Sequence, residues 1–173
     1  MEWWEGNIPI IAMLVILIVS YRWWPLSDLS YALLVIFLLL ATLGSHYSYE
    51  RSPIGAWLAA ALGDVRNPYD RLLHLCVGLL VYYLVYENLP RIARCRVPWS
   101  YLLPVAIILA ASAIWEIAEV YYGIGIHQNP GYAGTEDVFD SQHDMAMALV
   151  GSVVAMSITA GIHSLWRSGT QQD

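Results

Sequence analysis

Charged residues are scarce in this chain of 173 residues: they make up 13% of it, against 58% hydrophobic residues. Lysine is absent, so all eight basic residues are arginines. A soluble domain of this size carries roughly a quarter charged residues and lacks the long uncharged apolar runs that recur here. The composition therefore excludes a soluble domain and predicts an integral membrane protein.

Cysteine is also rare, and its two positions exclude a disulfide framework. Cys76 lies inside a long apolar run and Cys95 in an arginine-rich connection, so we assign them neither a bridge nor metal chemistry. The N-terminal segment has no basic region and no small-residue cleavage signature, so we expect a retained helix and not a removed signal peptide. Internal repeats and low-complexity tracts are absent as well.

Five apolar runs are long enough, with their aromatic flanks, to cross a bilayer core of about 30 Å as helices. Helix boundary signals accompany them: Asn67 can cap a helix, Pro68 suits its first turn, and Pro90 stops it. Only short connections remain between the runs. We therefore predict one all-α transmembrane domain over residues 1–173, with five spans at about 8–21, 29–45, 68–89, 99–122 and 141–166.

The arginines indicate the orientation of this bundle. Alternating five spans puts Arg51, Arg66 and Arg71 on one face and five arginines on the other, namely Arg22, Arg91, Arg94, Arg96 and Arg167. By the positive-inside rule, the face with five arginines is cytoplasmic. We predict an N-out, C-in topology, from a bias of five against three.

Acids and histidines gather at the opposite, extracytoplasmic ends of four spans. Asp70 and His74 are four residues apart and share one helix face, and Glu116 and Glu119, three apart, share another. The remaining members of the set, on the last helix and at the end of the second, are His46, Asp137, Asp140 and Asp144. If the bundle packs in the ordinary way, these side chains turn inward and form one polar site.

A divalent metal ion is the simplest counter-charge for such a site. An acidic residue near the centre of a membrane helix raises the free energy of insertion by about 2.5–3.5 kcal/mol. Several carboxylates without a cation are therefore energetically unfavourable. We predict that the ligands come from Asp70, His74, Glu116, Glu119, Asp137, Asp140 and Asp144. Carboxylates suit Mg²⁺, Ca²⁺ or Mn²⁺, whereas imidazoles move the preference towards Zn²⁺, Mn²⁺ or Fe²⁺, and the sequence does not choose among these ions. The Glu-x-x-His signature of di-iron bundles is absent.

Structural roles compete with the ligand roles at several of these positions. Asp137 can cap the last helix, and Asp140 suits the first turn because the helix dipole favours acids there. His46 can bond the terminal carbonyls of its helix, and His74 can be a satisfied interior imidazole. Glu116 has the weakest structural explanation, because it lies in an apolar run. His163, near the cytoplasmic end, is expected to have no part in the site.

Three motifs carry a resemblance to a known family, the YjdF-type bacterial inner-membrane proteins. The chain is similar to them from the second to the fifth span, through Asn67-Pro-Tyr-Asp70-Arg-Leu-Leu-His74, Trp115-Glu-Ile-Ala-Glu119 and Gly134-Thr-Glu-Asp137-Val-Phe-Asp140-Ser-Gln-His-Asp144-Met. It is more weakly similar to VanZ-like proteins, which are associated with glycopeptide-antibiotic resistance, and departs from them at Glu119 and Asp144. The first resemblance implies the bacterial inner membrane, and the second an envelope role by analogy.

The leading functional hypothesis is a metal-dependent hydrolase or transferase for lipid or lipid-linked substrates. A metal-bound water would be the nucleophile, Glu116, Glu119 or His46 the base, and Arg71 the residue that binds an anionic headgroup. The rival hypotheses are a cation- or proton-coupled transporter and a non-enzymatic envelope accessory protein. Membrane lipids are the expected partners and nucleic acid is not; a homodimer fits such a small bundle, but no residue specifies it.

Overall fold

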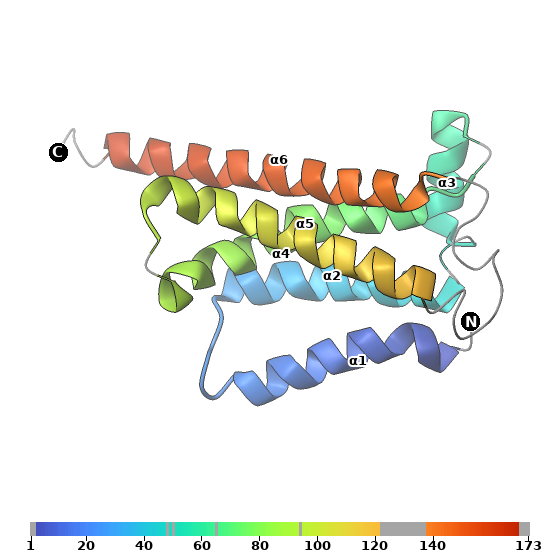
Figure 1. Cartoon of the computed structure of the whole chain (residues 1–173), viewed down its shortest axis with the longest axis horizontal. Coiled ribbons are helices and arrows are strands. Elements are labelled where there is room, and N and C mark those ends of the chain that lie inside the picture. Colours follow the sequence, from blue (N-terminus) through green and yellow to red (C-terminus); the bar gives the residue numbers. More distant parts are fainter. Residues whose placement is uncertain are drawn as a thin grey trace. The chain divides into compact units, whose positions relative to one another are not determined.

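The described part of the chain is all-helical, which confirms the predicted fold class (Figure 1). A computed structural model describes residues 3–47, 49, 51–64, 66–93, 95–121 and 138–169. The helices in these ranges are α1 (Trp3–Ser20), α2 (Asp28–Tyr47), α3 (Pro53–Leu62), α4 (Tyr69–Ile92), α5 (Val97–Val120) and α6 (Asp140–Gly169).

Four of these helices, α2, α4, α5 and α6, are long and apolar enough to cross a membrane. They coincide with the predicted spans 29–45, 68–89, 99–122 and 141–166 to within a few residues at each end. The predicted first span, 8–21, corresponds to α1, whose apolar part, Gly6–Ser20, falls among the shorter apolar helices. The membrane-bundle prediction is therefore confirmed, with α1 as the short member.

Helix α3 was not expected, because its stretch was interpreted as a short connection. Its ten residues are too few to cross a bilayer and therefore gave no span signal. The local sequence nevertheless specifies both ends. Pro53 occupies the first turn, and Gly63 ends the helix in the left-handed conformation (φ 69°), with its N–H bonded to the carbonyl of Ala59.

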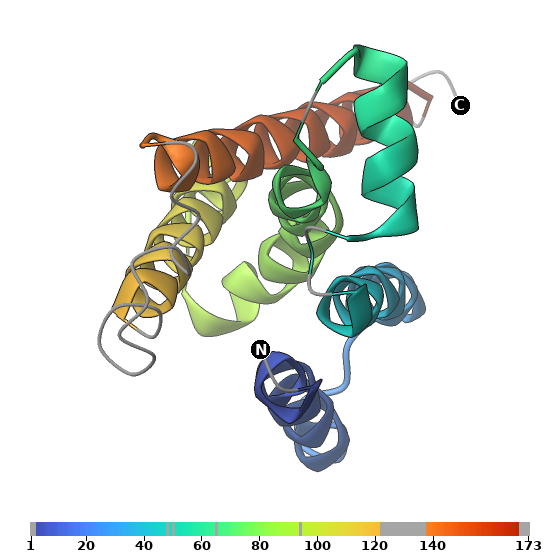
Figure 2. The same cartoon turned by 90° about the vertical axis from the view of Figure 1, so that its right-hand side faces the viewer.

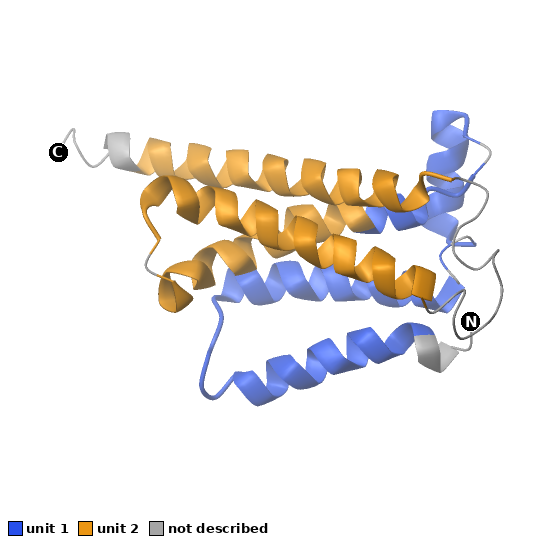
Figure 3. Cartoon of the chain, viewed as in Figure 1, with its two compact units in different colours: residues 1–73 blue, residues 74–173 orange. Residues whose placement is uncertain are grey.

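Contacts divide the chain into two compact units, Met1–Leu73 and His74–Asp173 (Figure 3). In unit 1, α1 packs on α2, and the buried Asn7 side chain donates to Ser45 Oγ at 2.8 Å. The start of α4 is fixed in the same unit, since the Tyr69 hydroxyl donates to the Leu40 carbonyl at 2.8 Å. Such interhelical hydrogen bonds replace the hydrophobic driving force that lipid does not supply.

Unit 2 is built from most of α4 together with α5 and α6. Helix α6 (orange to red) runs beside α5 (yellow) in both views (Figure 1, Figure 2). Its hydrophobic core cluster consists of Tyr82, Ile108, Ala148 and Ala155, with partly buried side chains around it that include Tyr86 and Met156.

Two glycines let α4 and α6 approach closely at the centre of unit 2. A Cβ atom on Gly78 would lie 2.2 Å from the Ala148 carbonyl oxygen, and one on Gly151 would lie 2.2 Å from the Leu75 carbonyl oxygen. The two backbones are therefore in direct contact, as small residues allow between membrane helices. This close crossing also controls how near His74 of α4 and Asp144 of α6, both in unit 2, come to each other.

Candidate functional site

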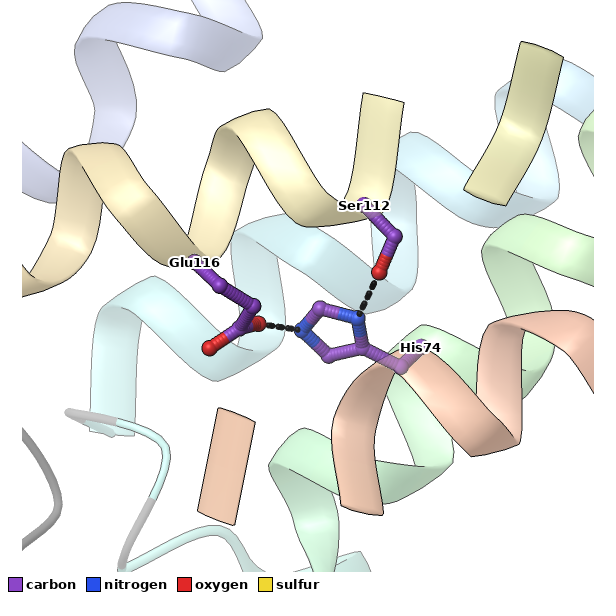
Figure 4. Close-up of polar contacts among 3 residues, drawn as sticks. All are labelled: His74, Ser112 and Glu116. Atoms are coloured by element: carbon purple, nitrogen blue, oxygen red, sulfur yellow. Dashed lines mark hydrogen bonds and ion pairs between the residues drawn. The ribbon is translucent and has the colours of Figure 1, made fainter. Parts of the chain in front are cut away.

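A buried histidine, His74 of α4, lies at the centre of the polar residues of unit 2 (Figure 4). Its Nε2 atom is 3.0 Å from Glu116 Oε1, and its Nδ1 atom is 3.1 Å from Ser112 Oγ. Ser112 and Glu116 are four residues apart, so both project from the same face of α5. All three residues are at most 6% exposed, so bulk water does not compete for their contacts.

A neutral imidazole avoids burying an extra positive charge in this group. With its hydrogen on Nε2, its Nδ1 accepts from the Ser112 hydroxyl. Nε2 then faces the Glu116 carboxylate at 3.0 Å, a close electrostatic contact without hydrogen-bond geometry, since Glu116 Oε1 has no hydrogen-bond partner among the described residues.

Helix α6 contributes a second acid to the surroundings of His74. Asp144 is only 1% exposed, and one of its carboxylate oxygens lies within 4.8 Å of a ring nitrogen of His74. Asp140, one turn earlier in the first turn of α6, is also buried. Asp70 precedes His74 by one turn on α4 and belongs to unit 1. Within unit 2, His74 therefore has carboxylates from α5 and from α6 near it.

The other predicted site residues are less closely tied to His74. Glu119 and Arg71 are half-buried, on the same helices as Glu116 and Asp70. His46, at the end of α2 in unit 1, is exposed and meets Tyr47 edge to face, with ring centroids 4.8 Å apart. Asp137 lies outside the described residues.

Ser112 is the site residue that sequence reasoning missed. The usable signal was its spacing of four from Glu116, which puts the hydroxyl on the acid's own helix face. That both would meet His74 could not be read from spacing, because it depends on how α4 packs against α5.

Comparison with known proteins places this geometry in a family. Residues 1–165 match the family model described as predicted membrane protein (DUF2238). The chain belongs to this family. It is also 30% identical over 167 residues to the inner membrane protein YjdF of Escherichia coli strain K12, with 94% of this chain and 79% of YjdF covered. No solved structure matches the chain.

The family assignment confirms the predicted resemblance and the cellular location. This DUF2238 protein is a polytopic protein of the bacterial inner membrane. The weaker similarity to VanZ-like proteins stays a sequence-based expectation. The buried residues around His74 fall within the matched range 1–165, so the site lies in the part of the chain that defines the family.

Proposed function

We propose that this DUF2238 protein binds a divalent metal ion beside His74 and uses it to hydrolyse or transfer groups on lipid or lipid-linked substrates. The observation that carries the proposal is the approach of His74 and Asp144, two buried ligand residues from different membrane helices, to within 4.8 Å. Ionisable residues inside membrane helices are costly, and those that persist generally serve a function.

The spacing of the ligand atoms suits a metal ion. Two atoms on opposite sides of one ion are about 4.4 Å apart at zinc-like bond lengths and about 5.2 Å apart at calcium-like ones. The ligand atoms of His74 and Asp144 lie within 4.8 Å of each other, close enough for one ion to contact both. An imidazole with carboxylates favours Zn²⁺, Mn²⁺ or Fe²⁺ over Mg²⁺ and Ca²⁺.

Glu116 fits an orienting role better than that of a direct ligand. Histidines that bind metals usually donate their other ring N–H to a carboxylate, which fixes the tautomer and raises the basicity of the ring. Glu116 Oε1, 3.0 Å from Nε2, supplies that acceptor and leaves Nδ1 for the metal. Ser112, 3.1 Å from Nδ1, would then turn toward the metal-bound water or the substrate.

A lipid substrate follows from where the site lies. His74 and Glu116 are buried within helices that can cross the membrane, about one turn inside their ends. A bound metal would supply a water of lowered pKa and a Lewis acid for a carbonyl or phosphoryl oxygen. Glu116 would orient His74 toward the metal, and Arg71, beside Asp70, would bind an anionic headgroup.

The rival hypothesis, a coupled transporter, is less well supported. It needs polar groups that continue from His74 along the helices. The middle of unit 2 is filled instead by Ile108, Ala148 and Ala155. The hydroxyls of Ser152 and Thr159 donate to carbonyls of their own helix. In the described part of unit 2, the polar residues near His74 therefore end at an apolar layer.

Elemental mass spectrometry of the detergent-purified protein tests the metal. We expect about one equivalent in the wild type and a loss of about tenfold or more in affinity for Asp144→Asn. Asp64→Asn is the matched control, since Asp64 is exposed and caps the backbone N–H of Arg66. Retention of the metal by Asp144→Asn, or its absence from the wild type, contradicts the metal site.

The catalytic part of the proposal needs its own measurement. Wild-type and variant proteins are incubated with a total lipid extract, and the products are identified by mass spectrometry. A product that forms with the wild type and with Asp64→Asn, but not with Asp144→Asn or His74→Ala, supports the reaction. Metal binding without any change in the lipids would support the metal site and contradict the proposed reaction.

A further inference from the structure

A second polar cluster lies at the far end of the same three helices, around His163 of α6. Its Nδ1 atom is 2.8 Å from the Tyr101 hydroxyl of α5 and 3.1 Å from the Tyr86 hydroxyl of α4. The rings pack closely as well, with the Tyr86 and Tyr101 centroids 5.1 Å apart and nearly stacked. His163, which was expected to have no role, thus joins all three helices of unit 2.

The number of hydrogen-bond donors in this cluster depends on the His163 tautomer. A ring nitrogen offers one bonding position, as either a lone pair or a hydrogen, whereas two phenol hydroxyls face Nδ1. The Tyr86 and Tyr101 hydroxyls also hydrogen-bond each other. If Nδ1 carries the hydrogen, one phenol hydrogen remains after that bond and can be donated to a further acceptor.

An open cavity of about 350 Å³ adjoins these donors. It is lined by Tyr86, Val97, Ser100, Tyr101, His163 and Trp166. This volume is at the small end of ligand pockets and suits a headgroup-sized ligand. No carboxylate is among the described residues that line it, so an anion entering the cavity meets hydroxyl and imidazole groups without like-charge repulsion.

The surrounding charge also favours an anion. Val97, Ser100 and Tyr101 form the first turns of the 24-residue α5, whose N-terminus carries partial positive charge and unbonded N–H groups. Arg96, exposed and directly before Val97, adds a full positive charge at the same end, and Arg91 lies in the last turn of α4. These features point to a ligand with several acceptor oxygens and a negative charge.

We propose that the His163 cavity binds a phosphate group, presented by an anionic phospholipid headgroup or as free inorganic phosphate. The phenol hydroxyls of Tyr86 and Tyr101 donate to its oxygens, and Arg96 balances its charge. The apolar core of unit 2 separates this cavity from His74. The proposal is therefore independent of the metal site and of the reaction assigned to it.

Native mass spectrometry of the detergent-purified full chain tests this site. The probes are phosphatidylglycerol, inorganic phosphate and, as a phosphate-free lipid, diacylglycerol. We expect phosphatidylglycerol to bind and diacylglycerol not to, and we expect Tyr101→Phe and Tyr86→Phe each to weaken binding about tenfold, the effect of one hydrogen bond to a charged group. Competition by inorganic phosphate would identify the free ion as a ligand, and its absence would identify the lipid headgroup.

Tyr83→Phe is the matched control, because Tyr83 is a half-buried tyrosine of α4 outside the cavity lining. Each phenylalanine variant removes one oxygen atom and keeps the ring, and thermal unfolding confirms that each remains folded. Equal phosphatidylglycerol binding by Tyr101→Phe and Tyr83→Phe would overturn the proposal. So would equal binding of phosphatidylglycerol and diacylglycerol with no binding of phosphate.

Discussion

At the scale of single residues, the free-energy cost of burying His74 depends on its two neighbours on α5. An imidazole buried without partners is expensive, because each unmet donor or acceptor retains its full desolvation cost. Ser112 and Glu116 meet both ring nitrogens, at 3.1 Å and 3.0 Å. The two contacts differ in kind, since one is between neutral groups and the other involves a carboxylate.

This difference predicts an order of stability for two variants. Ser112→Ala is expected to lower the free energy of unfolding by about 0.5–1.5 kcal/mol, and Glu116→Ala by about 1.5–3 kcal/mol, because a buried contact with a charged group is stronger than one between neutral groups. Unfolding by denaturant in detergent, followed by circular dichroism, measures both. Ser157→Ala is the control, since the exposed Ser157 hydroxyl bonds only to its own helix in the described contacts, at the Val153 carbonyl. An effect of Ser112→Ala no larger than that of the control would refute the contact.

At the scale of the helices, the crossing of α4 and α6 holds His74 and Asp144 at their separation. The crossing requires the absence of side chains at Gly78 and Gly151, where a Cβ would meet backbone atoms that cannot move aside. His74 lies one turn before Gly78 on α4, and Asp144 lies about two turns before Gly151 on α6. Forcing the helices apart at the glycines therefore also changes the candidate metal site.

We predict that Gly78→Ala and Gly151→Ala destabilise the protein by about 1–3 kcal/mol, the usual cost of overpacking, and weaken metal binding. Gly161→Ala on α6 is the matched control, because a Cβ there has no atom within 4 Å. That change should be neutral or should stabilise by about 0.5–1 kcal/mol, since alanine is the better helix former. Thermal unfolding and elemental analysis measure the two effects, and equal behaviour of Gly78→Ala and Gly161→Ala would disprove the crossing.

At the scale of the whole molecule, the predicted N-out, C-in orientation can be tested by the chemistry of cysteine. Cys95, between α4 and α5, should react with a membrane-impermeant maleimide in inverted vesicles and not in intact spheroplasts. An Asp64→Cys substitution, made with Cys95→Ser, should show the opposite pattern, because exposed Asp64 lies at the other end of α4. Cys95→Ser alone, which retains Cys76, controls for labelling inside the membrane. A reversed pattern would mean that the arginine bias misassigns the faces.

Most of the fold could be predicted because membrane-spanning helices can be recognised from the amino-acid composition of long segments. Lipid offers no hydrogen bonds to the backbone, so a long apolar run has to be helical. The span 29–45 therefore reappears as α2 with small changes at its ends. Helix α3 was missed for the converse reason: ten apolar residues cannot cross a bilayer, and short apolar runs have no single interpretation.

The candidate site could be predicted within each helix but not between helices. Spacing alone predicted that Asp70 and His74 lie on the same face of one helix, since residues four apart share a helix face. The pairing of His74 with Glu116 and Ser112, and the aromatic cluster at His163, needed the packing of α4, α5 and α6. Residues in these pairs are separated by 38 or more positions, and nothing in the local sequence specifies such a separation.

The sequence by itself determined the class of the protein, the approximate positions of its membrane spans and the helix faces on which the acids lie, because these depend on solvent transfer and on helical periodicity. Only the tertiary structure decided which acid faces which nitrogen of His74, and that His163 is bonded to two tyrosines. Those choices depend on how particular helices pack, α4 against α5 for His74 and all three helices for His163, while the two glycines set the approach of α4 to α6. Such a contact is a property of paired surfaces, and no single helix contains it.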